Sequence, residues 1–330
     1  MAKEKQPIAE TVERLLTGNR RAAARLISMI EGNDKGVREA MKLIYPHSGQ
    51  AVILGITGSG GAGKSSLTDQ LIRIYRRHGK SVGVVVVDPS SPFSGGALLG
   101  DRIRLTRHSL DDGVYIRSLA SRGHLGGLSR ATADVIRVME AMGKDLVIVE
   151  TLGAGQDEID VIHFVQTCLL VVTPGMGDDI QAMKAGIMEI ADILVVNKAD
   201  LDGATTCLRN LEAALNVKSF QKGEWVPKLI KTVAVASKEE ELEGIEELVS
   251  AIGEHQAHLH DSRAIDQVRI ERIEQELGLV FKEEVEKAVF QGLKGTGRKK
   301  GYINSILRGE SDPYSVVNEV LNSYLQPSQS

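Results

Sequence analysis

The sequence predicts an α/β fold with a mostly parallel sheet at its centre and helices at both ends of the chain. Six short apolar runs alternate with helical segments in the middle of the chain: AVILGIT, SVGVVVVD, DLVIVE, CLLVVTP, DILVVNKAD and KTVAVAS. These runs are continuous in Val, Ile and Leu rather than alternating with polar residues. Such runs are typical of parallel strands that helices cover on both faces.

The segments on either side of these runs show helical periodicity. Apolar residues recur at helical spacing within residues 8–45, where the sequence TGN interrupts them. Near the other end, an apolar stripe at helical spacing extends from Ile270 to Val289. We therefore expect three parts: a helical N-terminal extension over 1–48, an α/β domain over 49–258 and a helical C-terminal arm over 259–330.

Composition limits the classes of function. The formal net charge is −4 and the pI is about 6.1, so the chain lacks the basic field that favours a nucleic-acid partner. The N-terminus shows no apolar signal segment, and no apolar run approaches the roughly 20 residues that cross a bilayer. The two cysteines, Cys168 and Cys207, suit a reducing compartment. We expect a cytoplasmic protein with no nucleic-acid or membrane partner.

A glycine-rich run, GSGGAGKS at residues 58–65, fits the pattern G-x-x-x-x-G-K-[ST]. It follows a predicted strand and precedes a predicted helix, which is the context that a phosphate-binding loop requires. Backbone N–H groups would converge on phosphate oxygens, Lys64 would neutralise the β- and γ-phosphates, and the Ser65 hydroxyl would ligate Mg²⁺. The expected phosphate-binding residues are Gly58, Ser59, Gly60, Gly61, Ala62, Gly63, Lys64, Ser65 and Ser66.

A second motif indicates which base is bound. The run VVNKAD places Asn197, Lys198 and Asp200 at N-K-x-D spacing at the end of a predicted strand. The Asp200 carboxylate can accept two hydrogen bonds from guanine N1 and N2, whereas adenine offers no such pair of donors. The sequence VAVASK then predicts a loop that supports the base near Ser237. We expect GTP or GDP as the ligand; the alternative for Asn197 and Asp200 is capping of the strand end.

These segments together resemble the methylmalonyl-CoA mutase-associated GTPases of the MeaB and ArgK type. The resemblance extends from about residue 15 to residue 326, and it is carried by GSGGAGKSSL, VVVDPSSPFSGGALLGDRIR, VETLGAGQDE, PGMGDDIQAMKAG, VVNKADL and DPYSVVNEVL. It implies a P-loop NTPase core of the SIMIBI class. It also implies a G-protein chaperone of an adenosylcobalamin-dependent acyl-CoA mutase (methylmalonyl-CoA mutase or a relative), with an adenosyltransferase as a further candidate partner.

Several residues of these segments are candidates for Mg²⁺ binding and catalysis. Asp88 ends the strand VVVVD, where it could hold Mg²⁺ directly or through water, or start the turn before Pro89. The resemblance implies that Asp101 approaches Mg²⁺ from a first switch loop and that Arg104 either contacts phosphate or stays solvated. Glu150 stands where most P-loop GTPases carry an aspartate, and it would order a Mg²⁺-bound or attacking water. The expected catalytic residues are therefore Lys64, Asp101, Arg104 and Glu150, and the expected metal ligands are Ser65, Asp88, Asp101 and Glu150.

Two further features concern the switch between nucleotide states. Gly153 can present its N–H to the γ-phosphate and so sense hydrolysis. The segment PGMGDDIQAMKAG resembles an extra switch loop that couples the nucleotide state to the mutase, although its acids could also favour a helix start. The coupling residues expected there are Asp178, Asp179, Gln181 and Lys184. The family's C-terminal helices imply a homodimer.

Three alternatives remain open at this point. A small-molecule kinase for amino acids or a transport protein could use the same phosphate loop, although no separate acceptor site is evident. A metal-insertion GTPase of the hydrogenase-maturation type would need His and Cys clusters, which this sequence lacks, and a scaffold would bind GDP and GTP only for stability. No D-x-H-x-x-G cobalamin-binding motif occurs, so we expect a stand-alone chaperone rather than a mutase.

Overall fold

The computed structural model describes residues 7–88, 105–120, 127–151, 163–175, 190–217, 220–221, 223–235, 242–295 and 298–325. The chain divides into two compact units, Met1–Arg272 and Ile273–Ser330, and each is described by itself. The domain boundaries expected at residues 48 and 258 stay predictions. Among the described residues, no helix is both long and apolar enough to cross a membrane.

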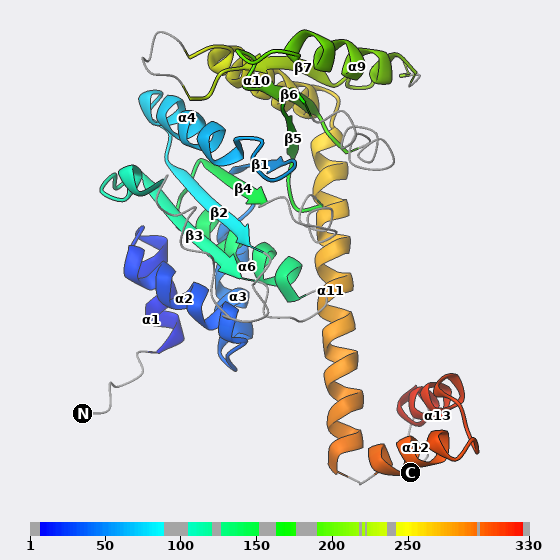
Figure 1. Ribbon diagram of the computed structural model, residues 1–330. Coiled ribbons are helices and arrows are strands. Elements are labelled where there is room, and N and C mark those ends of the chain that lie inside the picture. The colour runs from blue at the N-terminus through cyan, green and yellow to red at the C-terminus, as the bar shows by residue number, and fades with distance from the viewer. Residues whose placement is uncertain are drawn as a thin grey trace. The chain divides into compact units, whose positions relative to one another are not determined.

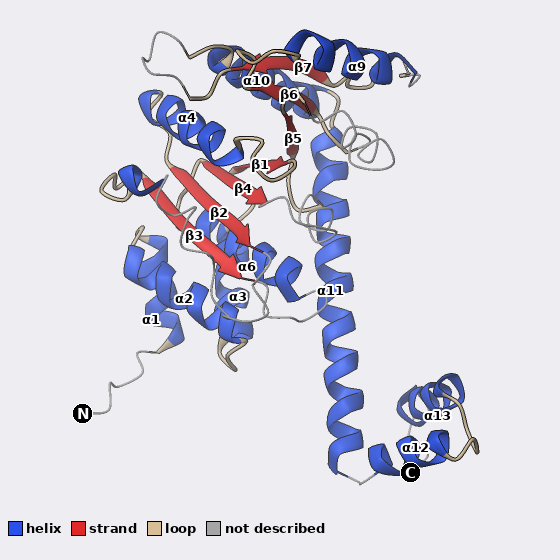
Figure 2. Ribbon diagram, viewed as in Figure 1, coloured by secondary structure: helices blue, strands red, loops and turns tan. Residues whose placement is uncertain are grey.

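A seven-stranded sheet forms the centre of the first unit, in the order β3-β2-β4-β1-β5-β6-β7 (Figures 1 and 2). Every neighbouring pair of strands is parallel. The strands are β1 (Val52–Thr57), β2 (Val82–Asp88), β3 (Val114–Ala120), β4 (Leu146–Thr151), β5 (Thr167–Val172), β6 (Ile193–Asn197) and β7 (Lys228–Thr232). The predicted α/β fold with a parallel sheet is therefore confirmed.

Helices cover both faces of the sheet (Figure 2). The described helices of the first unit are α1 (Ile8–Leu16), α2 (Arg20–Gly32), α3 (Val37–Ile44), α4 (Lys64–Arg77), α6 (Gly127–Ala141), α9 (Ala204–Val217) and α10 (Ile245–Asp261), with short 3-10 turns at Tyr45–His47 and Thr106–His108. The helix α11 (Ala264–Gly295) begins in the first unit.

Alternate residues of the strands pack against different helices. In β5, Leu169 and Val171 belong to the core that α4 and α10 cover, whereas Leu170 packs with Leu211 of α9 in a second core. On the face away from α4, a Cβ at Gly83 of β2 would lie 2.7 Å from the sulfur of Met139 in α6. Both faces are apolar because both are covered, which explains why the strands read as continuous apolar runs.

The N-terminal helices pack against the rest of the first unit. α1 and α2 contact α6, and α3 contacts both α2 and α6. Asn19 begins α2, since its side-chain oxygen accepts hydrogen bonds from the N–H groups of Arg21 and Ala22 at 3.1 and 3.0 Å. This cap follows the helix break that the sequence TGN predicts.

The strand β3 is an element that the apolar pattern does not predict. Its sequence, VYIRSLA, carries Arg117 and Ser118 at its centre, and it forms one edge of the sheet. Arg117 is tolerated there because it pairs with Glu31 of α2. An edge strand that carries polar residues lacks the continuous apolar run that identifies the central strands.

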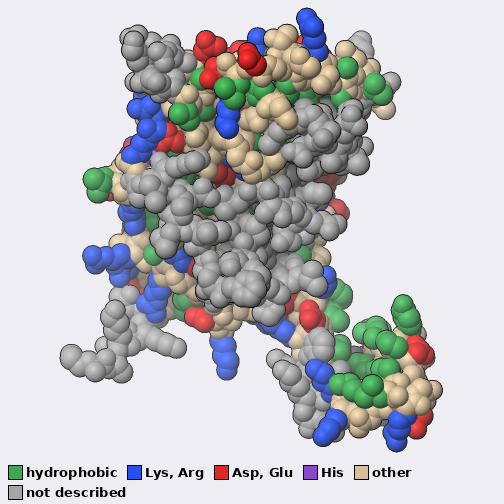
Figure 3. Space-filling view, viewed as in Figure 1, with side chains coloured by type: hydrophobic (Ala, Val, Ile, Leu, Met, Phe, Trp, Pro, Cys, Tyr) green, Lys and Arg blue, Asp and Glu red, His purple; other side chains and the backbone are tan. Residues whose placement is uncertain are grey.

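The second unit contains the continuation of α11, followed by α12 (Arg298–Leu307) and α13 (Pro313–Leu325). The Tyr302 hydroxyl donates a hydrogen bond to Glu319 Oε1 at 2.8 Å, which ties α12 to α13. Hydrophobic side chains gather on these two helices (Figure 3), and several on α11 are also exposed: Ile273, Leu277, Val280, Phe281 and Val285. The apolar stripe predicted from the sequence is therefore helical and largely exposed within this unit.

Candidate nucleotide-binding site

The carboxyl ends of the parallel strands meet at one edge of the sheet, where ligands bind in open α/β folds. The glycine-rich loop connects the end of β1 to the start of α4. At two of its glycines a larger residue would be strained by a positive φ and would also meet a neighbouring atom. At Gly58, where φ is 138°, a Cβ would lie 2.1 Å from the Val171 carbonyl oxygen, and at Gly63, where φ is 91°, it would lie 2.2 Å from Asn197 Nδ2.

Lys64 is held against this loop. Its Nζ donates hydrogen bonds to the carbonyl oxygens of Gly58, at 2.5 Å, and Ser59, at 2.8 Å. The side chain is buried, with 5% of its surface exposed. The ammonium group therefore lies at the loop whose N–H groups the sequence predicts to bind phosphate.

A buried carboxylate lies beside the first turn of α4. Glu150 of β4 is 1% exposed, and it accepts hydrogen bonds from the hydroxyls of Ser65, at 2.5 Å, and Thr68, at 2.7 Å. Because the Ser65 hydroxyl donates its single proton to Glu150, its oxygen lone pairs remain available to a cation. This arrangement fits the predicted magnesium site, with Ser65 as a ligand and Glu150 as the group that orients it.

Asn197, at the end of β6, connects the glycine-rich loop to the end of β7. Its Nδ2 donates to the Ala62 carbonyl at 2.9 Å, and its Oδ1 accepts from the Thr232 hydroxyl at 3.1 Å and the Ala234 N–H at 3.3 Å. The next residue, Lys198, has a left-handed φ of 56°. The side chain of Asn197 thus uses both donor and acceptor to join three backbone segments.

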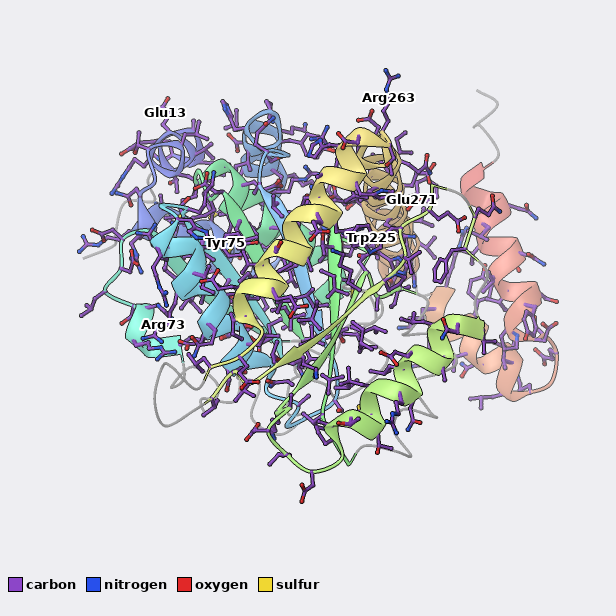
Figure 4. All side chains as sticks on the ribbon, turned by 90° about the horizontal axis from the view of Figure 1, so that it is seen from above. Glu13, Arg73, Tyr75, Trp225, Arg263 and Glu271 are labelled. Atoms are coloured by element: carbon purple, nitrogen blue, oxygen red, sulfur yellow. The ribbon has the colours of Figure 1, made fainter. Side chains whose placement is uncertain are left out.

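A cavity of about 930 Å³ opens between these elements. The glycine-rich loop and α4 form one side of the cavity. The segment Asn197–Leu201 and the residues after β7 form another side. Arg73, which Figure 4 labels, lies on α4 and lines the cavity. The lining residues include Gly61, Gly63, Ser66, Asn197, Lys198 and Asp200. The structure therefore brings the two sequence motifs to a single cavity.

A charged cluster that the sequence analysis does not predict forms part of the cavity wall. Asp69 of α4 is 4% exposed; its carboxylate pairs with the guanidinium of Arg107 and lies 2.8 Å from His108 Nε2. Burial, and next the charges of Arg107 and Arg73, lower the pKa of His108. The signal that could have revealed Asp69 is helical spacing: it follows Ser65 by one turn, and Thr68 and Gln70 are its neighbours.

Other predicted site residues lie outside the described residues. For Asp88 the backbone is described but the side chain is not: it ends β2, opposite Ala120 in the parallel register. The remaining ones are Asp101, Arg104, Gly153, Asp178, Asp179, Gln181, Lys184 and Ser237. Their predicted roles stay predictions. Among the described residues, no group of three or more His, Cys, Asp or Glu side chains is placed to hold a metal ion.

The comparison with solved structures identifies the fold. A crystal structure of an LAO/AO transport system kinase covers 99% of this chain and 100% of its own, with a TM-score of 0.71 and 26% sequence identity. The fold is that of the P-loop NTPases.

Comparisons of sequence identify the family. The model of the methylmalonyl-CoA mutase-associated GTPase MeaB matches residues 23–294. A GTPase of Pyrococcus horikoshii is 47% identical over 318 residues, covering 96% of this chain and 98% of the relative. GTPase ArgK of Escherichia coli is 35% identical over 290 residues, 86% of each chain. The fused isobutyryl-CoA mutase of Cupriavidus metallidurans is 41% identical over 206 residues, 61% of this chain and 19% of that protein. The chain belongs to the family of methylmalonyl-CoA mutase-associated GTPases of the MeaB type, as its motifs predict.

Proposed function

We propose that this protein is a Mg²⁺-dependent GTPase that converts GTP and water to GDP and phosphate, and whose nucleotide state gates cofactor loading of an acyl-CoA mutase. The observation that carries the proposal is the Asn197 side chain. It joins the glycine-rich loop to the end of β6, so that the loop, Lys198 and Asp200 line one cavity. A phosphate site and a guanine-reading carboxylate in one cavity suit a guanine nucleotide.

Within this cavity each described residue has a proposed task. Backbone N–H groups of residues 58–66 and the N-terminal end of α4 bind phosphate oxygens. Lys64 neutralises the β- and γ-phosphates, and Asp200 accepts hydrogen bonds from the guanine edge. Ser65 would hold Mg²⁺, with Glu150 fixing the direction of the Ser65 hydroxyl and ordering a water. When bound, the ion supplies positive charge that offsets the charge developing on the phosphate oxygens.

The proposed switch depends on the loss of the γ-phosphate. Asp88, Gly153 and the 89–104 segment, which contains Asp101 and Arg104, would respond to that phosphate. In GTPases, γ-phosphate contacts order switch loops and hydrolysis releases them. Of the two carboxylates that line the described part of the cavity, Asp69 pairs with Arg107 and Asp200 is assigned to the guanine edge. We therefore expect slow intrinsic hydrolysis that a partner accelerates.

The proposed partner is an adenosylcobalamin-dependent acyl-CoA mutase. Two comparisons support it: the family is named for its association with methylmalonyl-CoA mutase, and a relative is named as a fused isobutyryl-CoA mutase. We propose that Asp178, Asp179, Gln181 and Lys184 couple the nucleotide state to this client, and that an adenosyltransferase is a further partner. The exposed apolar face of α11 would form a homodimer.

One experiment tests the role. GTP turnover is measured for the protein alone and with purified methylmalonyl-CoA, isobutyryl-CoA, ethylmalonyl-CoA and 2-hydroxyisobutyryl-CoA mutases. We expect at least one mutase to raise the rate, and the same mutase to load adenosylcobalamin in a GTP-dependent way with the wild type but not with Lys64→Ala. Turnover that no mutase changes would contradict the chaperone role.

A second candidate is a small-molecule kinase, since the similar solved structure is that of an LAO/AO transport system kinase. The same assay distinguishes the two. A GTPase releases the γ-phosphate to water at a rate independent of added amino acids. A kinase transfers it to an acceptor, so a phosphorylated product that forms at the expense of free phosphate would favour the second candidate.

A further inference from the structure

One face of α4 continues the cavity wall beyond the phosphate-binding loop. Ser66, Asp69, Gln70 and Arg73 all line the cavity, and their spacing of three, four and seven residues places them on the same side of the helix. At 1.5 Å per residue, this face extends about 10 Å from Ser66 to Arg73. Phosphates bind at the start of a helix, so a nucleoside that extends from them into this cavity would lie beside the later part of the wall, around Asp69.

Arg107 joins this wall from outside the helix. Its Nε donates to Asp69 Oδ1, and its Nη2 pairs with Asp69 Oδ2, so the two groups form a bidentate pair. The Asp69 side chain is only 6% exposed, whereas that of Arg107 is 48% exposed and lines the cavity. The carboxylate therefore fixes the plane of the guanidinium group, and Nη1 has no hydrogen-bond acceptor among the described residues.

The same buried carboxylate also holds the residue next to Arg107. His108 is 8% exposed and lies 2.8 Å from Asp69 Oδ1 through its Nε2. Two consecutive residues are thus anchored to one turn of α4. A solvent-exposed ion pair contributes little to stability. Stability alone therefore does not explain why two consecutive residues contact the same buried carboxylate.

We propose that Arg107 is a nucleoside-binding residue: its guanidinium plane, held by Asp69, packs on the face of the guanine base whose edge Asp200 reads. A planar cation suits the face of a purine, and a stacked base is worth about 1–3 kcal/mol. Asp69 acts through Arg107 and is a positioning residue. The inference rests on the proposed function, because it requires that the cavity take a guanine nucleotide.

Isothermal titration calorimetry with unlabelled GMP and GDP tests the proposal. For Arg107→Ala we expect the Kd of both nucleotides to rise by the same factor, about tenfold, at low and at high salt. Arg107→Lys keeps the charge without the plane and should restore little of the affinity. Asp69→Asn keeps the shape of the anchor and should give a smaller rise in Kd than Arg107→Ala.

Arg76→Ala is the matched control. Arg76 also lies on α4 and forms a bidentate pair, with Asp111 at 2.9 Å for both contacts, but it does not line the cavity. Its loss should lower stability without changing the Kd of GDP.

Four results would overturn the inference: an unchanged Kd in Arg107→Ala, full recovery in Arg107→Lys, an equal loss in Arg76→Ala, or a loss that is larger for GDP than GMP and fades in salt. The last would assign Arg107 to phosphate. If the wild type itself fails to bind GDP, the proposed function fails. If the wild type binds and Arg107→Ala matches it, this inference alone fails.

Discussion

The carboxyl ends of the parallel strands form one side of the sheet, called here the carboxyl edge, and their amino ends form the opposite side, the amino edge. Both edges bury polar side chains, but these side chains make different kinds of contact. At the carboxyl edge, Asn197 lines a cavity of about 930 Å³, and Lys64 and Glu150 lie buried at the glycine-rich loop and the first turn of α4 beside it. At the amino edge, Thr167 begins β5 and Asp192 directly precedes β6. There the side chains pair with one another and with α10.

The amino edge forms a chain of hydrogen bonds around His255 of α10. His255 Nδ1 lies 2.9 Å from the Thr167 hydroxyl, and its Nε2 lies 3.4 Å from Asp192 Oδ1. Gln256 Nε2 donates to the same Thr167 hydroxyl at 2.5 Å, and the ring of Trp225 packs 4.7 Å from that of His255. These groups resemble a catalytic triad in their chemistry, yet Thr167 is fully buried.

The difference shows that burial and hydrogen bonding alone do not identify a functional site. At the carboxyl edge, left-handed glycines and the start of a helix border a cavity, whereas at the amino edge the Thr167 hydroxyl, His255 and Gln256 Nε2 contact one another. Substitutions at the carboxyl edge should therefore change ligand binding or turnover more than stability. Substitutions at the amino edge should do the reverse.

The largest expected effect is on turnover in Lys64→Ala. Removing a charged donor from a phosphate-transfer site costs about 10²–10³ in kcat. We expect GTP turnover to fall by that factor, while thermal unfolding monitored by circular dichroism changes little. A variant that unfolds in proportion to its lost turnover would make Lys64 a structural residue and break the contrast between the edges.

The next effect separates two glycines of the same loop. In Gly58→Ala, a left-handed backbone and a carbonyl oxygen 2.1 Å from the new Cβ force a shift of the loop. We expect a loss of stability of about 2–3 kcal/mol and loss of GDP binding. Gly60→Ala is the control, because a Cβ there meets nothing within 4 Å. Equal GDP affinity in the two variants, measured by calorimetry, would contradict this explanation of the loop.

Thr167→Val tests the amino edge. It keeps the side-chain shape but leaves His255 and Gln256 without their hydroxyl partner. We expect the free energy of unfolding to fall by about 1–3 kcal/mol, as measured by chemical denaturation. The Kd of GDP should stay within about twofold of the wild type, because the altered contacts lie at the edge away from the cavity. A Kd that rises with the loss of stability would show that the two edges are coupled.

The smallest expected effect concerns how stability depends on pH. At the amino edge, the contributions of Asp192 and His255 to this dependence cancel in part. Burial raises the pKa of Asp192 to about 7, so its contribution to stability is lost as pH rises from about 4 to 7. Burial, and next the charge of His258, lower the pKa of His255 to about 4. Its contribution is present above about pH 6.5 and is lost as pH falls toward 4. The two trends oppose each other in the wild type.

Single substitutions should separate these trends. Relative to the wild type, Asp192→Asn should gain stability as pH rises from about 4.5 to about 6.5, and His255→Gln should lose it over the same range. Denaturation curves at several pH values measure both differences. Slopes of the same sign in the two variants would refute the opposed titrations.

The fold and the two motifs could be predicted from the sequence because their chemistry is local. Buried parallel strands produce continuous apolar runs, and a phosphate loop must contain its glycines and lysine in a fixed order. The family identification follows from longer segments such as PGMGDDIQAMKAG. The pattern does not predict the edge strand β3 because Arg117 and Ser118 interrupt its apolar run, and the contact of Arg117 with Glu31 is not visible in the sequence.

The rest of the site depends on contacts between residues distant in sequence. Asp69 and Arg107 are 38 residues apart, and neither belongs to a motif. The hydrogen bond of Thr68 to Glu150 spans 82 residues. Spacing along α4 could have suggested which of its side chains face the cavity, but not which residues meet them there.

We propose that the cavity at the carboxyl edge recognises guanine through Asp200. Calorimetric titration of the wild type and Asp200→Asn with GDP, ADP and XDP tests it most directly, since an asparagine amide can donate to the oxygen at C2 of xanthine. We expect the wild type to bind GDP about 10³-fold or more tightly than ADP, and Asp200→Asn to bind XDP more tightly than GDP. Equal binding of GDP and ADP by the wild type, or an unchanged preference for GDP in Asp200→Asn, would contradict it.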